Sequence, residues 1–310
     1  MTWLDVNNAC VETIHFLQDV IQWIIKFLTD STLYNDLYNT VTGNVIINII
    51  KSTAITLCVL FFLIDFFQKT MHLQWVTWEN VLLFFMKLFI AKIAVENAGG
   101  VLSIIQNGFD SILNSSIQAL APNSSDPADT FGLLFSQRLF PMIQSGVPDA
   151  NPNAGYVSYF FSSSDNHFGE ICQGSESISV TATFYNIQLF IIGLILKIVF
   201  IMCAIIVIAR VFELLVYTAI APIPLATLSC EGLQDVGKGF LKSFAGVCLQ
   251  SVVIIIMMIV YSTMLSSSAF DFSAISNQWR GQVKLLLFTF IFGAGVMQSG
   301  SWAKKICGAM

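Results

Sequence analysis

The sequence predicts an all-α, polytopic membrane protein with about five transmembrane helices, an N-terminal amphipathic helix and a proline-broken re-entrant hairpin. Of its 310 residues, 55% are hydrophobic and 11% are charged, whereas about 25% of an average soluble domain is charged. The mean hydropathy is +0.75. Between Lys92 and Lys197 the one Lys or Arg is Arg138. Because cytoplasmic loops of membrane proteins collect Lys and Arg, this long cation-poor stretch is typical of an extracytoplasmic region.

Five apolar stretches predict the transmembrane helices, because a helix of about 20 apolar residues spans the hydrocarbon core of a bilayer. They occupy residues 45–67, 81–97, 184–208, 243–265 and 284–297.

Two further segments have the 3.6-residue period of amphipathic helices. Residues 11–28 predict a helix that lies on a membrane surface or on a partner. Residues 102–120 predict a second one outside the membrane core, with Gln106 and Asp110 facing away from its apolar stripe. The apolar stripe of the first helix is formed by Ile14, Leu17, Ile21, Ile24 and Leu28.

The stretch at 122–179 is rich in Ser, Asn, Asp, Gly and Pro, with one apolar helix candidate at 131–143. Such a composition predicts an extracytoplasmic loop region. The chain then divides into an amphipathic region, two membrane helices, an extracytoplasmic region and three membrane helices with an elbow. These segments are 1–44, 45–97, 98–183 and 184–310.

Pro222 and Pro224 interrupt the apolar stretch 214–226. A proline lacks the backbone N–H and clashes with the preceding helical turn. Two prolines one residue apart therefore predict a broken or re-entrant hairpin and not a full crossing. A full crossing would change the parity of the spans and with it the predicted orientation.

The distribution of cations predicts that the N-terminus lies outside the cytoplasmic membrane and the C-terminus inside. This orientation places six cations in inner loops and three in outer ones. The inner cations are Lys69, Arg210, Lys238, Lys242, Lys304 and Lys305, and the outer ones are Lys26, Arg138 and Arg280.

Four charged residues fall within predicted membrane helices, where an isolated charge costs about 3 kcal/mol or more. Two interpretations stay open. The charges line a polar conduit, or they are neutralised in the bundle, where they pair with each other or with Asp65 or where Lys87 snorkels to the interface. The four residues are Lys87, Lys92, Glu96 and Lys197.

Small and amide side chains in the last two spans predict close helix packing and hydrogen bonds between helices. They are Gln250, Gly293, Gly295 and Gly300.

No pattern predicts an enzyme, a cofactor site or a metal site. Residues 232–239 approach a phosphate-binding loop, but Gly239 follows Lys238 where that loop requires Ser or Thr. This segment predicts a flexible cytoplasmic turn. The three histidines, at positions 15, 72 and 167, lie in different regions of the chain.

Residues 209–226, ARVFELLVYTAIAPIPLA, and residues 237–243, GKGFLKS, resemble the TrbL-type polytopic subunit of conjugative type IV secretion systems. More specifically, these stretches resemble the form carried by integrative elements of Gram-positive bacteria. Residues 88–92 and 96–97 of the second predicted span resemble it too.

The resemblance implies a channel or platform subunit that forms homo-oligomers in the lipid bilayer. Its partners would be a coupling ATPase, an assembly ATPase and a cell-wall hydrolase, which together move a DNA–relaxase complex out of the cell. Contact of this subunit with the DNA stays open. The candidate cytoplasmic elbow for ATPase contact consists of Arg210, Glu213, Pro222, Pro224 and Lys238.

Two other classes of protein fit parts of the sequence. A small-solute transporter would use broken helices and often an internal inverted repeat, and the sequence has one proline-broken segment without a visible repeat. A purely structural membrane scaffold would need no polar path. Crosslinking of DNA to Lys87 or Lys92 would distinguish a channel from a scaffold.

Overall fold

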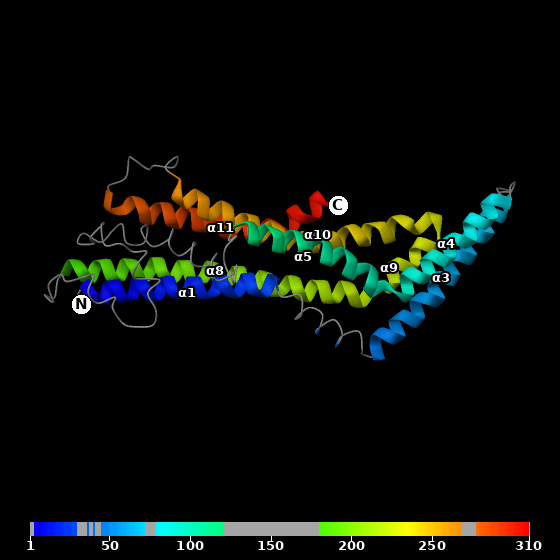
Figure 1. The fold of residues 1–310 in the computed structure, drawn as a ribbon, viewed down its shortest axis with the longest axis horizontal. Coiled ribbons are helices and arrows are strands. Elements are labelled where there is room, and N and C mark those ends of the chain that lie inside the picture. Colours follow the sequence, from blue (N-terminus) through cyan, green and yellow to red (C-terminus); the bar gives the residue numbers. More distant parts are fainter. Residues whose placement is uncertain are drawn as a thin grey trace. The chain divides into compact units, whose positions relative to one another are not determined.

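The computed structural model describes residues 3–29, 36, 40, 45–71, 78–120, 180–267 and 277–309. Within these ranges every element is an α-helix or a 3₁₀-helix, which confirms the all-α fold class (Figure 1). The predicted loop 122–179 and its helix candidate 131–143 lie outside the described residues. The elements are α1 (Trp3–Thr29), α3 (Val45–Met71), α4 (Trp78–Glu96), α5 (Ala98–Leu120), α8 (Val180–Ile220), α9 (Pro222–Ala226), η2 (Thr227–Ser229), η3 (Glu231–Leu233), α10 (Gln234–Ser266) and α11 (Asn277–Ile306).

Among the residues that the structure describes, four helical segments are long and apolar enough to cross a membrane, so the chain is a multi-pass membrane protein. They are Ile47–Met71, Ile187–Ile220, Glu231–Leu265 and Gly281–Ile306. A fifth candidate is the pair formed by α4 and α5, which are bent by 75° at Asn97 and qualify only together. The predicted second span, 81–97, thus ends at this bend.

The helix breaks at the prolines themselves and not at residue 214, where the predicted broken segment begins. α8 continues without interruption to Ile220, because residues 214–220 include no proline and the N–H of Ala221 still bonds to Tyr217 O at 2.9 Å. Pro222 occupies the first turn of α9, where its missing N–H leaves no helical bond unmade. The chain then reverses through α9, η2 and η3 into α10 (Figure 1).

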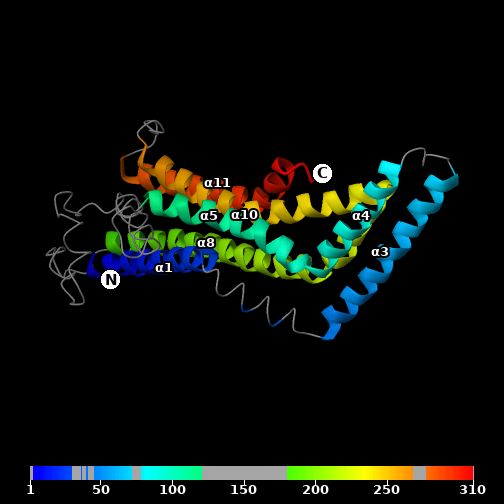
Figure 2. The same ribbon diagram turned by 45° about the vertical axis from the view of Figure 1, so that its right-hand side comes forward.

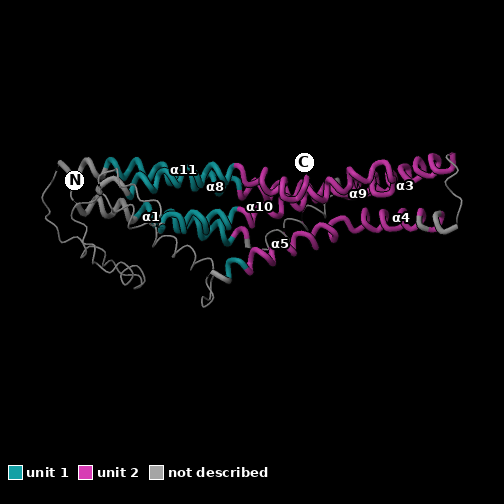
Figure 3. The backbone as a smooth tube through the Cα atoms, turned by 90° about the horizontal axis from the view of Figure 1, so that it is seen from above, with its two compact units in different colours: residues 1–26, 116–206, 254–297 teal, residues 27–115, 207–253, 298–310 magenta. Residues whose placement is uncertain are grey.

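The chain folds as two compact units, each built from segments far apart in the sequence (Figure 3). Unit 1 contains residues 1–26, 116–206 and 254–297, and unit 2 contains residues 27–115, 207–253 and 298–310. The sequence-based segments divide the chain by expected membrane position, and that division stays a prediction.

In unit 1, α1 packs alongside the first half of α8 (Figure 2). The predicted stripe is buried, with Ile14, Ile21 and Ile24 fully inaccessible. Gly193 of α8 permits a close approach, because a Cβ there would stand 2.9 Å from Thr13 Oγ1. The helix is therefore confirmed. Its apolar stripe packs against the protein, however, so the stripe is not available for the expected contact with a membrane surface.

Unit 2 packs α3, α4 and α9 around small buried side chains. Ala54, Cys58, Ala91 and Leu225 belong to one core cluster with Phe244 of α10. α3 and α4 form an antiparallel hairpin (Figure 2), and the rings of Phe62 and Phe84 meet across it with centroids 4.5 Å apart.

The orientation of α5 differs from the expectation. Gln106, for which the sequence predicts a position away from the apolar stripe of this helix, is buried on the same face as Leu102 and Leu113, whereas Ile112 is 52% exposed. Residues 102, 106 and 113 share one helical face. The packing of unit 2 therefore encloses a face with a polar residue and leaves part of the apolar stripe outside.

Gly237 and Gly239 allow a matched test of packing near the start of α10. A Cβ on Gly237 would stand 2.7 Å from Leu228 Cδ2 and 2.9 Å from the backbone O of Pro224, whereas a Cβ on Gly239 would meet nothing within 4 Å. We expect Gly237→Ala to destabilise the protein by about 1–3 kcal/mol through overpacking. Gly239→Ala should be neutral or stabilise it by up to about 1 kcal/mol. Thermal unfolding in detergent measures both, and equal midpoints for the two variants would contradict this packing.

Candidate functional site: the elbow between α8 and α10

The elbow, residues 221–238, comprises the connection from α8 to α10 and the first residues of α10, all within unit 2. Pro222 is buried and Pro224 is partly buried. Thr227 Oγ1 donates to Pro224 O at 2.7 Å, which tightens the turn after α9. Ser229 Oγ lies 2.8 Å from Ala226 O and 3.1 Å from Cys58 O of α3. The elbow is thus hydrogen-bonded both internally and to a helix far away in the sequence.

Glu231 forms the centre of an ion network that ties the elbow to α3 and α4. Its carboxylate accepts hydrogen bonds from Lys69 at 2.8 Å and from Lys87. Its backbone N–H donates to Asp65 Oδ2 at 3.4 Å, and Lys69 also lies 3.5 Å from Asp65. The Lys69 ammonium is 5.0 Å from the ring centroid of Phe84. Two acidic and two basic side chains therefore compensate each other where three elements meet.

Arg210 joins α8 to α10. The side chain is 5% exposed, and its Nε donates to Val247 O at 2.9 Å while Nη2 lies 3.4 Å from Cys248 O. The carboxylates of Asp110 and Glu213 interact electrostatically with the guanidinium. Because a buried charge without partners is very unfavourable, these acceptors fix the relative position of the two helices inside unit 2.

Glu213 extends this link to the end of α11, where it accepts from Lys304 at 2.9 Å. α10 approaches the same turn of α11 closely, because a Cβ on Gly246 would stand 3.0 Å from Lys304 Cα. Gln250 Nε2 donates to Ser299 Oγ at 3.1 Å, and Gly300 faces the Gln250 amide. These contacts hold α10 against the last turns of α11.

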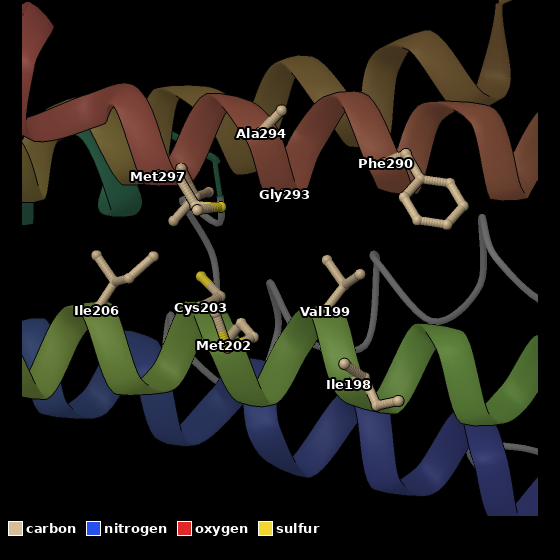
Figure 4. A pocket seen from close by; sticks show the side chains of 10 residues that line it. Ile198, Val199, Met202, Cys203, Ile206, Phe290, Gly293, Ala294 and Met297 are labelled. Carbon is tan, nitrogen blue, oxygen red and sulfur yellow. The ribbon is translucent and has the colours of Figure 1, made fainter.

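Gly293 and Gly295 belong to unit 1. A Cβ on Gly293 would stand 3.0 Å from Val199 Cγ1 of α8, and Gly295 is buried. Gly293 also borders a cavity of about 260 Å³ between α8 and α11. Figure 4 shows Cys203 and Ile206 of α8 pointing toward α11, which carries Met297 on the other side of this space. Its lining is apolar apart from the Cys203 thiol, and no charged side chain contributes to it.

The four predicted intramembrane charges have different surroundings. Lys92 and Glu96 lie 3.7 Å apart on α4. Lys87 binds Glu231 and so belongs to the elbow. Lys197 belongs to unit 1, where its ammonium is 5.4 Å from the ring centroid of Phe16. Of the four predicted intramembrane charges, the described contacts therefore bring together only Lys92 and Glu96.

Of the predicted elbow residues, Lys238 is the exposed one. The others are tied into unit 2 by the contacts above. Sequence reasoning named Asp65 as a pairing partner for the intramembrane charges but missed the roles of Lys69, Glu231 and Lys304. The spacing of Asp65 and Lys69, four residues apart on a helix, was a usable signal for their pairing. Glu231 is 144 residues from Lys87 in the sequence, and no local pattern indicates such a contact.

Among the described residues, no group of three or more His, Cys, Asp or Glu side chains could hold a metal ion. The elbow is instead an electrostatic and hydrogen-bonded clamp with an exposed outer surface. Ile223, Val236 and Lys238 contribute to that surface.

No family model, curated protein or solved structure matches this chain.

The resemblance of residues 209–226 and 237–243 to the TrbL-type subunits therefore stays a prediction, and the description of the elbow rests on its own geometry.

Replacing Glu231 by Gln tests the ion network. The variant keeps the side-chain shape but loses two ion pairs with partly exposed lysines, each worth about 0.2–1 kcal/mol. We expect a lower midpoint of thermal unfolding in detergent and a difference from wild type that shrinks at about 1 M salt, where charges are screened within about 3 Å. Asp235→Asn, at an exposed carboxylate on the next helix, is the control. A difference that does not change with salt would contradict an electrostatic clamp.

Replacing Arg210 by Lys tests the link between α8 and α10. The ammonium keeps the charge but cannot donate from two positions of a planar fork. Hydrogen bonds to charged groups contribute about 1.5–3 kcal/mol, and we expect a loss of that size in the free energy of unfolding. Lys238→Arg exchanges the same residue types at an exposed site and should stay within about 0.5 kcal/mol of wild type. Wild-type stability of Arg210→Lys would show that the guanidinium bonds contribute little.

Proposed function

We propose that this chain is a membrane-embedded channel or platform subunit of a conjugative type IV secretion system. In this role it supports the transfer of a DNA–relaxase complex across the cytoplasmic membrane. One observation carries the proposal. The two sequence stretches that resemble the TrbL-type subunits, 209–226 and 237–243, meet at the elbow, where a Cβ on Gly237 would stand 2.9 Å from Pro224 O, within one compact unit of an all-α, multi-pass membrane protein.

The proposed orientation has the N-terminus outside and the C-terminus in the cytoplasm. The elbow and the end of α11 then face the cytoplasm. Their cations, Lys238, Lys242, Lys304 and Lys305, agree with the rule that short inner loops carry Lys and Arg. Residues 98–183 would face outward, where the proposed cell-wall hydrolase acts.

The elbow supplies the proposed contact with the coupling ATPase or the assembly ATPase. Its outer surface combines exposed Val236 and Lys238 with partly exposed Ile223. The ion network below this surface holds the elbow in one conformation, which lowers the entropy lost when a partner binds.

The contacts of the four predicted intramembrane charges favour a platform subunit over a subunit whose charges line a conduit. Lys87 is engaged by Glu231 in the elbow, and Lys197 lies beside the Phe16 ring in unit 1. Lys92 and Glu96 compensate each other at 3.7 Å. Charges occupied in this way stabilise a bundle, whereas a conduit needs them to face its lumen.

Purification of the tagged protein from its native membranes in mild detergent, followed by mass spectrometry, tests the proposal. We expect a large assembly that contains the two ATPases, the cell-wall hydrolase and several copies of this chain. A small species without these partners, found also after crosslinking in the intact membrane, would contradict the secretion function and favour a transporter.

Substitutions in the elbow should separate membrane insertion from transfer. Replacing Pro222 and Pro224 together by Ala should leave the protein in the membrane and abolish transfer, because the turn between α8 and α10 loses its fixed backbone geometry. Lys238→Glu changes an exposed side chain. It should retain wild-type stability yet reduce transfer about tenfold or more, because the new carboxylate would repel acidic groups on the docking surface of the ATPase. Mating frequency measures both variants.

Lys242→Glu, a second charge reversal at an exposed position of α10, serves as the control for Lys238→Glu. Wild-type mating frequency in both the double proline variant and Lys238→Glu would remove the elbow from the transfer function.

A further inference from the structure

Unit 1 contains another cavity, of about 140 Å³, which we name the α1–α8 cavity. The two helices lie side by side (Figure 2), and Gly193 allows their close approach, because a Cβ there would stand 2.9 Å from Thr13 Oγ1. Glu12 of α1 and Lys197 of α8 both border the cavity. A carboxylate and an ammonium from two helices therefore meet the same small space.

The two opposite charges at the α1–α8 cavity do not bind each other. The Lys197 ammonium lies 5.4 Å from the ring centroid of Phe16. Such a ring attracts a cation but provides no lone pair for the three N–H groups of an ammonium. Among the described residues, neither Glu12 nor Lys197 forms a salt bridge. A ligand that bridges the two side chains must therefore carry an anionic group for Lys197 and a cationic group for Glu12.

The length of the apolar part of α8 indicates the depth of the cavity in the membrane. The candidate span Ile187–Ile220 has 34 residues. At 1.5 Å per residue it is about 51 Å long, whereas the hydrocarbon core is about 30 Å thick. With the span centred in the bilayer, about seven residues at each end lie at the level of the lipid headgroups. The boundary then falls near Gly193 and Leu194, so the cavity lies where headgroups meet hydrocarbon.

The apolar border of the cavity continues onto the outer surface of α8. Phe190 and Leu194 both line the cavity, and they are 66% and 48% exposed. Exposed apolar side chains on a membrane-spanning helix contact lipid chains. A molecule with its charged end between Glu12 and Lys197 could therefore place an acyl chain along Phe190 and Leu194.

We propose that the α1–α8 cavity binds the zwitterionic headgroup of phosphatidylethanolamine. The Lys197 ammonium binds the phosphate, and the Glu12 carboxylate accepts hydrogen bonds from the lipid ammonium. Phosphatidylglycerol offers the phosphate but no cation for Glu12. Phosphatidylcholine has a cation without N–H groups, so it cannot donate to the carboxylate.

This inference rests on the membrane placement of α8 and not on the secretion function. It would hold equally for a scaffold or a transporter. Failure of the lipid-binding test leaves the co-purification of ATPases unaffected, and loss of the secretion function leaves the lipid site standing.

Native mass spectrometry of the full chain tests the lipid preference. The protein is purified in detergent, stripped of lipid and mixed with equal amounts of phosphatidylethanolamine, phosphatidylglycerol and phosphatidylcholine that carry the same acyl chains. We expect the phosphatidylethanolamine complex to exceed each of the others at least about fivefold. Equal amounts of the three complexes would overturn the proposal.

Soluble phosphoethanolamine distinguishes a lipid from a free solute with the same charged groups. At equal concentration it should not displace the lipid, because it lacks the acyl chains that contact α8. Displacement would show that the cavity takes a free zwitterion and would contradict the lipid assignment.

Two substitutions test the roles of the charged side chains. Lys197→Gln should reduce the phosphatidylethanolamine complex about tenfold or more through loss of the charged hydrogen bonds to the phosphate. Glu12→Gln should abolish the preference for phosphatidylethanolamine over phosphatidylglycerol. A lost preference with phosphatidylglycerol binding retained is not an effect of misfolding, which would weaken both complexes.

Asp19→Asn, at an exposed carboxylate of α1, is the control for Glu12→Gln. Lys92→Gln, at a side chain of α4 that is 55% exposed, is the control for Lys197→Gln. Both controls should bind lipids as the wild type does. A wild-type lipid preference in Glu12→Gln, or wild-type binding in Lys197→Gln, would overturn the proposal.

Discussion

The buried guanidinium of Arg210 is the interaction on which the arrangement of unit 2 depends. Because a buried cation must have acceptors, the carbonyls of Val247 and Cys248 lie beside it and bring α10 back along α8. The chain can reverse there because the prolines end α8 at Ile220 and begin a short helix. The bond from Lys304 to Glu213 then adds the end of α11 to the same turn.

Glu231 joins this hairpin to α3 and α4, two helices that precede it by more than a hundred residues. The contact relies on charge and not on apolar packing alone, since Lys69, Lys87 and Asp65 all meet Glu231. Both Asp65 and Lys69 lie near the end of an apolar helix, where isolated charges would be tolerated at the membrane surface. In the fold they instead fix the position of the elbow, and the elbow presents Lys238 outward. A fixed support with an exposed cationic surface is the property that the proposed platform role needs.

Hydropathy and backbone chemistry predicted the parts of this fold that depend on local sequence. The apolar stretches of α3, α8, α10 and α11 are long enough to be recognised alone, and the prolines predicted a break. Packing decided the rest. Gln106 of α5 is buried because it lies on the same helical face as Leu102 and Leu113, which pack into the protein. The apolar stripe of α1 is buried against α8. The partners of Glu231 could not be predicted because they come from distant segments, each with several charges that could have paired.

The position of the elbow relative to the membrane tests the account most directly. Lys238→Cys can be treated in intact cells with a membrane-impermeant thiol reagent, and the modification at residue 238 followed by site-resolved mass spectrometry. Wild type provides the background from the native cysteines, of which Cys58, Cys203, Cys230 and Cys248 are buried. A cytoplasmic elbow predicts no modification at residue 238 in intact cells and full modification after the membrane is permeabilised. Modification in intact cells would place the elbow outside and contradict its role as an ATPase contact.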